Sequence, residues 1–279
     1  MFYVEKNDKP NWLVRILNLI KVEYNTITVP ICEKTTSKQI EKLAQKTNKI
    51  INKLSNSKKA VLSKQAQEEV QFVNYLNSYG IQIANGRWLF EILLVDIVEY
   101  LINKKKIEKA NISILINDLT EIELRNIRTL AIKYKTINIV TNHIEKFTKL
   151  EEQLREREGI IITITNNKKK SLMKSNIIIN VDFPKELLNK YRIKEDSNII
   201  NLRGKMKIVQ KRFNGLNINN YEIDFRDDKK EICAYSGKFY LRDLYESKLY
   251  KKQGIDVILQ EINRDKVVIK KLYLNNGTI

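Results

Sequence analysis

The sequence predicts an α/β protein with two α/β parts followed by a small α+β region. Short runs rich in isoleucine alternate with longer stretches whose apolar residues recur at helical spacing. The runs lack polar alternation, which is typical of parallel strands buried on both faces. This alternation ends near residue 203. We therefore expect an N-terminal α/β domain at residues 1–86, a second at 87–203, and a C-terminal α+β region at 204–279.

In the N-terminal part, residues 9–24 are ambiguous and fit a short helix that runs into a strand. The β-rich residues 26–31 contain Pro30 and predict a strand near an edge. Helices are expected at 35–54 and 65–79, the second ending at Gly80. Short strands are predicted at 60–62 and 81–83.

The second part is expected to open with one long bridging helix at residues 87–104. Strand–helix units of the spacing that follows build parallel sheets through right-handed crossovers. The predicted strands are 112–117, 137–141, 160–165, 176–181 and 197–202, the predicted helices are 119–134 and 144–158, and a lysine-rich loop is expected at 166–170.

The C-terminal region shows a different pattern. It has β-rich pieces near 205–210, 221–225 and 232–240, an amphipathic helix near 241–252, and a strand at 267–274. The sequence does not fix how these pieces connect.

Two local sequence motifs, together with the order of predicted strands and helices, indicate a family resemblance for residues 87–202. Residues 139–143 read Ile-Val-Thr-Asn-His, similar to a V-x-N-R-T motif with His143 in place of arginine, and residues 175–180 are similar to A-D-I-I-I-N. This part resembles the Rossmann-type domain of the glutamyl-tRNA reductase and shikimate dehydrogenase group. The resemblance implies an NADP-type cofactor at the strand ends, and an N-terminal α/β domain to which residues 26–84 would correspond.

The turn after the first strand of this domain departs from that group. A dinucleotide-binding turn needs the pattern G-x-G-x-x-G, whereas residues 117–123 contain no glycine. Asp118, Glu121 and Glu123 place negative charge at a helix N-terminus, where they stabilise the helix but repel a diphosphate. The second strand also ends without an acidic residue for a ribose. We therefore predict a degenerate dinucleotide-binding fold with no cofactor, and keep NADP as an alternative in which His143 meets the 2′-phosphate.

Polar side chains follow the predicted strands, and open parallel sheets bind ligands beyond the carboxyl ends of their strands. One interpretation is a ligand cleft; the other is that asparagine merely ends strands and caps helices. Asp118 and His143 would form an acid–base pair only if they are adjacent. The candidate ligand-binding residues are Asn117, Thr141, Asn142, His143, Thr165, Asn166 and Asn180.

The formal net charge of +18 suggests a nucleic-acid partner, but the charge is spread along the chain. The 41 isoleucines, 39 lysines and 30 asparagines also indicate an AT-rich coding sequence, which raises the lysine content by itself. Bases alternate with aromatic residues near the C-terminus, a pattern that suits single-stranded nucleic acid, although leucines there also lie at core spacing. The candidate nucleic-acid contacts are Lys238, Arg242, Lys248, Lys251 and Lys252.

Cysteine and histidine are scarce, which limits the possible chemistry. Cys32 and Cys233 cannot form a disulfide framework, and one histidine leaves no His/Cys metal site. Without a signal peptide or an apolar span we expect a cytoplasmic protein and no membrane partner. The predicted function is a non-catalytic binding or interaction role with a protein or small molecule. The alternatives are an oxidoreductase-like enzyme that binds NADP or another phosphorylated ligand, and a nucleic-acid-binding protein.

Overall fold

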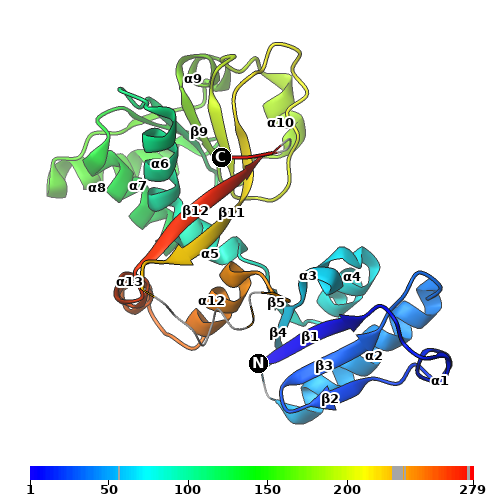
Figure 1. Cartoon of the computed structure of the whole chain (residues 1–279). Helices are drawn as coiled ribbons and strands as arrows, with labels where there is room; N and C mark the ends of the chain where they lie inside the picture. The colour runs from blue at the N-terminus through cyan, green and yellow to red at the C-terminus, as the bar shows by residue number, and fades with distance from the viewer. Residues whose placement is uncertain (56, 228–234, 236, 275–276) are drawn as a thin grey trace. The chain divides into compact units, whose positions relative to one another are not determined.

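The chain is a mixed α/β protein with two mainly parallel sheets, as the sequence predicted (Figure 1). The computed structural model describes residues 1–55, 57–227, 235, 237–274 and 277–279. Two compact units are formed, one from residues 1–86 and 225–266 and the other from residues 87–224 and 267–279. The expected division after residue 86 coincides with a boundary between the units. The expected C-terminal region, 204–279, is instead shared between them.

The first unit contains a five-stranded sheet in the order β2-β3-β1-β4-β5. Strand β1 pairs in parallel with β3 and β4, β4 pairs in parallel with β5, and β2 is the antiparallel edge. The strands are β1 (Phe2–Asn7), β2 (Lys21–Glu23), β3 (Thr26–Pro30), β4 (Lys59–Leu62) and β5 (Gln82–Ala84). Strand β1 was not predicted, and residues 9–24 contain both the short helix α1 (Trp12–Ile16) and β2.

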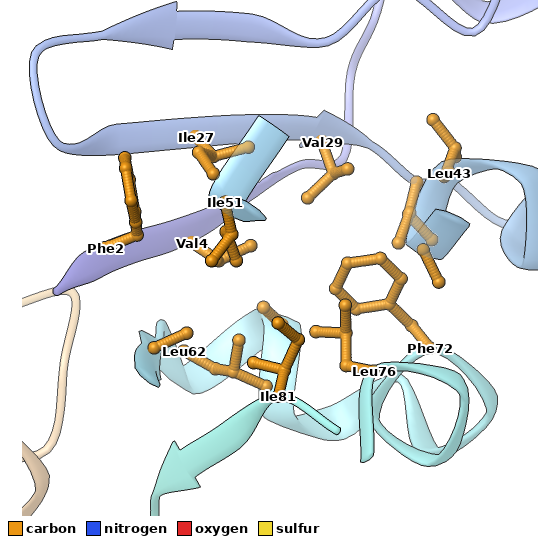
Figure 2. Packing of buried hydrophobic residues seen from close by; sticks show 14 of the residues in the cluster. Phe2, Val4, Ile27, Val29, Leu43, Ile51, Leu62, Phe72, Leu76 and Ile81 are labelled. Carbon is orange, nitrogen blue, oxygen red and sulfur yellow. The ribbon is translucent and has the colours of Figure 1, made fainter. Parts of the chain in front are cut away.

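Successive side chains along each strand point to opposite faces of this sheet, and both faces carry apolar residues. Phe2 and Val4 of β1 lie in the core with helix α2 (Ser37–Leu54) and helix α4 (Val70–Ser78), as Figure 2 shows. On the other face, Val61 and Ala84 pack against helix α12 (Leu241–Leu249). The predicted helix 65–79 is divided at Glu69 into α3 (Lys64–Glu68) and α4. Helix α13 (Ile255–Arg264) was not predicted.

The second unit contains an eight-stranded sheet in the order β13-β12-β11-β10-β9-β6-β7-β8. The pairings from β8 to β11 are all parallel, while β13 pairs with β12 antiparallel. The strands are β6 (Ile112–Leu115), β7 (Ile137–Val140), β8 (Thr163–Thr165), β9 (Ile177–Asn180), β10 (Asn198–Asn201), β11 (Asn217–Phe225), β12 (Val267–Leu274) and β13 (Gly277–Thr278). Numbered along the chain, the six parallel strands have the order 3-2-1-4-5-6, which is that of a Rossmann fold.

Helices connect these parallel strands from β6 to β10, whereas residues 202–216 join β10 to β11 without a helix. Strands β6, β9 and β10 are buried along their whole length. The connecting helices are α7 (Glu121–Lys133), α8 (Ile144–Glu158), α9 (Lys168–Lys174) and α10 (Lys185–Lys190). The lysine-rich segment expected as a loop instead supplies the first turn of α9, which Asn167 caps by accepting the Lys170 N–H at 3.0 Å. The expected bridging helix is interrupted at Leu93 and forms α5 (Arg87–Ile92) and α6 (Leu94–Lys105).

The predictions for the C-terminal region are met only in part. Residues 205–210 form no strand, nor do the described residues 235 and 237–240, while 232–234 and 236, including Cys233, lie outside the described residues. The β-rich segments expected at 221–225 and 267–274 lie within β11 and β12. These two strands extend the second sheet and do not form a separate C-terminal region. Among the described residues, none of the helices has the length and apolar character needed to traverse a bilayer.

Candidate functional site

The strand order of the second unit reverses between β6 and β9. After β6 the chain continues to β7 on one side of this point, and after β9 it continues to β10 on the other side. In Rossmann folds the ligand binds at the carboxyl ends of the strands beside this point. Here the two strands are in register, with Leu115 opposite Asn180, so the residues that follow them meet at the same edge.

The carboxylate of Asp182 lies at the carboxyl ends of β6 and β9, where it binds the turn that follows β6. Its Oδ2 accepts the backbone N–H of Asn117 at 2.7 Å and that of Asp118 at 2.9 Å, while Oδ1 accepts the Asn117 side-chain amide at 3.1 Å. In a dinucleotide-binding turn, backbone N–H groups at this place face the pyrophosphate. Asp182 therefore supplies an anion from within the chain to the donors that a phosphate would need.

The N-terminus of α7 is also occupied by an internal carboxylate. Glu123 accepts the Thr120 backbone N–H at 2.7 Å and a short hydrogen bond from the Thr120 hydroxyl. Asp118 is exposed, and its carboxylate lies 3.7 Å from Lys146. The negative charges at this helix start favour the helix dipole but oppose a bound phosphate. A dinucleotide does not fit the residues of this turn, because it contains no glycine and its donors already bind Asp182.

A line of polar contacts continues from this turn toward β7 and β8. Asn117 Oδ1 accepts the Asn142 N–H at 3.0 Å, and Asn142 Oδ1 accepts a hydrogen bond from Lys168 Nζ at 2.7 Å. The exposed His143 begins α8, and its backbone N–H donates to Thr141 Oγ1 at 3.0 Å. The structure thus brings Asn117 and Asn142 together. Asp118 is paired with Lys146, not with His143, as an acid–base pair would require.

The remaining candidates at this edge have local structural contacts. Thr165 Oγ1 accepts the N–H of Asn167, and Asn166 is exposed beside it. Asn180 is fully buried and binds the loop after its own strand: its Oδ1 accepts the Phe183 N–H at 3.0 Å, and its Nδ2 donates to the Phe183 carbonyl at 3.0 Å.

Asn180 also belongs to a buried asparagine cluster that the sequence analysis did not identify. Asn180 Nδ2 lies 3.4 Å from Asn201 Oδ1, and Asn201 Nδ2 donates to Asn217 Oδ1 at 2.5 Å and to Asn219 Oδ1 at 3.1 Å. The backbone of Met206 completes the cluster. Its N–H donates to Asn219 Oδ1, and its carbonyl accepts a hydrogen bond from Asn217 Nδ2. The sequence signal was the placement of asparagines at the ends of neighbouring strands. Their amide groups bind one another, which satisfies buried polar groups without a ligand.

The candidate nucleic-acid residues lie in the first unit, where most of them neutralise acids. Lys238 pairs with Glu5 at 2.7 Å, and Lys252 pairs with Glu261 at 3.2 Å. The buried Arg242 lies 3.3 Å from Asp243, and its guanidinium stacks 4.3 Å from the centre of the Tyr240 ring. Lys251, by contrast, is exposed.

Lys248 is the most constrained of these bases. Its Nζ lies 2.6 Å from Asp265 and 3.0 Å from Glu261, both of which are buried. Desolvation acts to lower the pKa of Lys248, but the hydrogen bonds to Asp265 and Glu261 outweigh it and raise that pKa. Lys248 therefore holds α12 against α13 and has little capacity left for a phosphate.

A pocket of 350 Å³ in the first unit is lined by Tyr3, Leu244, Lys248 and Lys251, among others. Its aromatic wall is formed by the parallel rings of Tyr3 and Tyr235, whose centres lie 5.9 Å apart. In the described part of the chain, no group of three or more His, Cys, Asp or Glu side chains is placed to hold a metal ion.

Comparison with known proteins gives only weak structural similarity. No family model matches the chain, and no curated protein matches it. A solved structure of a shikimate 5-dehydrogenase-like protein is 12% identical, with a TM-score of 0.32, and the match covers 95% of this chain and 96% of that one. Ornithine carbamoyltransferase from Pyrococcus furiosus is 10% identical, with a TM-score of 0.30, over 72% of this chain and 71% of that one. With TM-scores of 0.32 and 0.30 and at most 12% identity, these similarities are too weak to support any statement about the fold or function of this chain.

Proposed function

We propose that this chain is a non-catalytic binding or interaction protein of the cytoplasm, built on a dinucleotide-binding fold that has lost its cofactor site. The observation that carries the proposal is the Asp182 carboxylate, which accepts the two backbone N–H groups of Asn117 and Asp118. A phosphate would have to displace this carboxylate and then lie beside the charges of Asp118 and Glu121. The partner is a protein or a small molecule without a diphosphate.

The buried asparagine cluster supports the same proposal. In an active Rossmann enzyme, polar groups at the strand ends are directed at the ligand. Asn180, Asn201, Asn217 and Asn219 instead bind one another and the adjoining backbone. A ligand at these strands would break hydrogen bonds that are already satisfied inside the protein.

Thermal unfolding of the purified protein with candidate ligands tests the proposal. A ligand present at about a hundred times its dissociation constant stabilises a protein by about 2.7 kcal/mol, so real binding raises the melting temperature by several degrees. We expect no rise with NAD(H), NADP(H) or inorganic phosphate at millimolar concentration. A dose-dependent rise with NADPH that is lost in Asn142→Ala and Lys168→Ala would contradict the proposal and favour the enzyme.

Nucleic acid is tested in the same experiment with a short single-stranded oligonucleotide. Binding that weakens steeply with salt and is lost in the double variant Lys251→Gln and Lys252→Gln would favour that alternative. The ion pairs of Lys238, Lys248 and Lys252 with buried or partly buried acids lead us to expect no such binding at these residues.

A further inference from the structure

The first unit exposes an apolar segment between β1 and β3, which we call the apolar finger and define as residues 12–24. Trp12 is 65% exposed, Leu13 48%, Ile16 55% and Leu17 54%. No residue of helix α1 is buried. Single exposed leucines are ordinary, but a contiguous exposed group of this kind marks an interaction surface.

The finger is a fixed part of the fold. Asn11 caps α1 by accepting the Val14 N–H at 2.9 Å, Ile20 packs against the core of the unit, and β2 pairs with β3. Lys46 of α2 donates to the carbonyls of Leu17 at 3.2 Å and Asn18 at 2.9 Å. These contacts hold the finger beside α2 at the periphery of the unit, where Figure 1 shows α1.

Helix α2 carries a basic stripe next to the finger. At 3.6 residues per turn, the stripe lies within about 80° of arc, and all its side chains are exposed. Its members are Lys38, Lys42, Lys46, Lys49 and Lys53. Apart from Lys46, which binds the finger, none of them forms an ion pair or hydrogen bond with the residues that the structure describes. This stripe therefore keeps its charge available for an anionic partner.

We propose that the apolar finger and the basic stripe together bind the surface of a membrane that contains anionic lipids. Lysines attract anionic headgroups, while tryptophan and leucine enter the boundary between headgroups and acyl chains. The helix of the finger, α1, is far shorter than the roughly 20 residues that a membrane-spanning helix needs. The sequence-based expectation of no membrane partner rested on the absence of such a span.

The chemistry of the finger favours a bilayer over the other anionic or apolar partners. Nucleic acid stacks on aromatic rings, and the finger offers it the exposed Trp12 and Tyr24, but the aliphatic Leu13, Ile16 and Leu17 offer no stacking surface. A second copy of the chain would bring two lysine stripes and two charges of +18 together. An apolar layer beneath anionic headgroups matches both the apolar side chains of the finger and the charge of the stripe.

Vesicle co-sedimentation of the full chain tests this proposal. The probe is phosphatidylcholine vesicles with about one third phosphatidylserine, compared with phosphatidylcholine alone. We expect binding to the anionic vesicles only. Trp12 and Trp88 are the only tryptophans, so a Trp88→Phe background isolates Trp12, whose emission should shift to the blue as it leaves water.

Two variants separate the contributions of finger and stripe. The change Trp12→Ser with Leu13→Ser should weaken vesicle binding by more than about ten-fold, because both side chains are exposed in the free protein and lose their membrane contact. The change Lys42→Gln, Lys49→Gln and Lys53→Gln should weaken it by about five-fold per lysine at low salt. The matched control removes the same charge from the second unit through Lys169→Gln, Lys170→Gln and Lys190→Gln, and should leave binding unchanged.

Three results would overturn the proposal. The first is no binding to anionic vesicles. The second is binding that the control variant weakens as much as the stripe variant does, which would indicate a general effect of net charge. The third is a dimer of the unmodified protein that Trp12→Ser with Leu13→Ser converts to a monomer, or an oligonucleotide complex that needs Trp12, since either would assign the finger to another partner. Circular dichroism of each variant verifies that it is folded.

Discussion

Replacing Asp182 by alanine removes the carboxylate that binds the turn after β6 in the second unit. Three donors then lose their acceptor: the backbone N–H groups of Asn117 and Asp118 and the Asn117 side-chain amide. Hydrogen bonds to a charged group contribute about 1.5–3 kcal/mol each when buried. Water reaches this edge, since Asp118 is exposed and Asn117 half-buried, and so we expect a total loss of about 2–3 kcal/mol.

Tryptophan fluorescence can follow the second unit alone. Trp12 lies in the first unit and Trp88 in the second, so a Trp12→Phe background reports unfolding of the second unit. In urea, Asp182→Ala should lower the free energy of unfolding by the amount above, which corresponds to about 5–10 °C in melting temperature for a unit of this size.

Asp118→Ala is the matched control for this substitution. It removes a carboxylate from the same turn, but one whose side chain is 90% exposed and 3.7 Å from Lys146. Such pairs contribute little, so we expect a change of less than about 0.5 kcal/mol. Equal losses for Asp182→Ala and Asp118→Ala would refute the reasoning, because the effect would then reflect only the loss of a surface charge.

Three further predictions concern buried polar groups. Asn201→Ala should destabilise the second unit by about 3 kcal/mol in urea unfolding, since it leaves buried amide groups without partners; a loss below about 1 kcal/mol would show that the cluster is replaceable by water. Burial raises the pKa of Asp243 to about 7 in the folded protein, so the folded state holds a proton that the unfolded chain releases near pH 4, and stability falls as pH rises from about 4 to 7. Between pH 5 and pH 8 the free energy of unfolding of Asp243→Asn should therefore rise by roughly 2–4 kcal/mol relative to that of the parent. A stability difference that does not vary with pH would argue against the raised pKa of Asp243. Lys248→Ala should lower the stability of the first unit by about 1–3 kcal/mol, because Asp265 loses its positive partner. Lys251→Ala should leave that stability unchanged. A lower melting temperature for Lys251→Ala than for Lys248→Ala would count against the structural role of Lys248.

Periodicity predicted most of the second unit because its parallel strands β6 to β10 are short segments rich in isoleucine. The helix at 144–158 was predicted with the bounds of α8. Strand β1 escaped prediction because Phe2 and Val4 point into the core while the residues between and after them are partly exposed, which leaves too short a pattern. Helix α9 was mistaken for a loop because most of its residues are lysine, and only its cap at Asn167 marks its start.

The candidate site was predictable only in outline. The absence of glycine from the turn is a property of the sequence, and it led to the expectation of a lost cofactor site. The carboxylate that binds this turn comes from Asp182, 65 residues further along the chain, and only the pairing of β6 with β9 brings it there. In the same way, nothing in the order of residues shows that Trp12 and its neighbours remain outside the core.

Backbone amide resonances of Asn117 and Asp118 give the most direct test of the central claim, that an internal carboxylate closes the dinucleotide crevice. These two N–H groups should be protected from hydrogen exchange, and their chemical shifts should not change when NADPH is added to millimolar concentration. In Asp182→Ala they should lose protection. Saturable shifts of both amides on adding NADPH to the unmodified protein would contradict the claim.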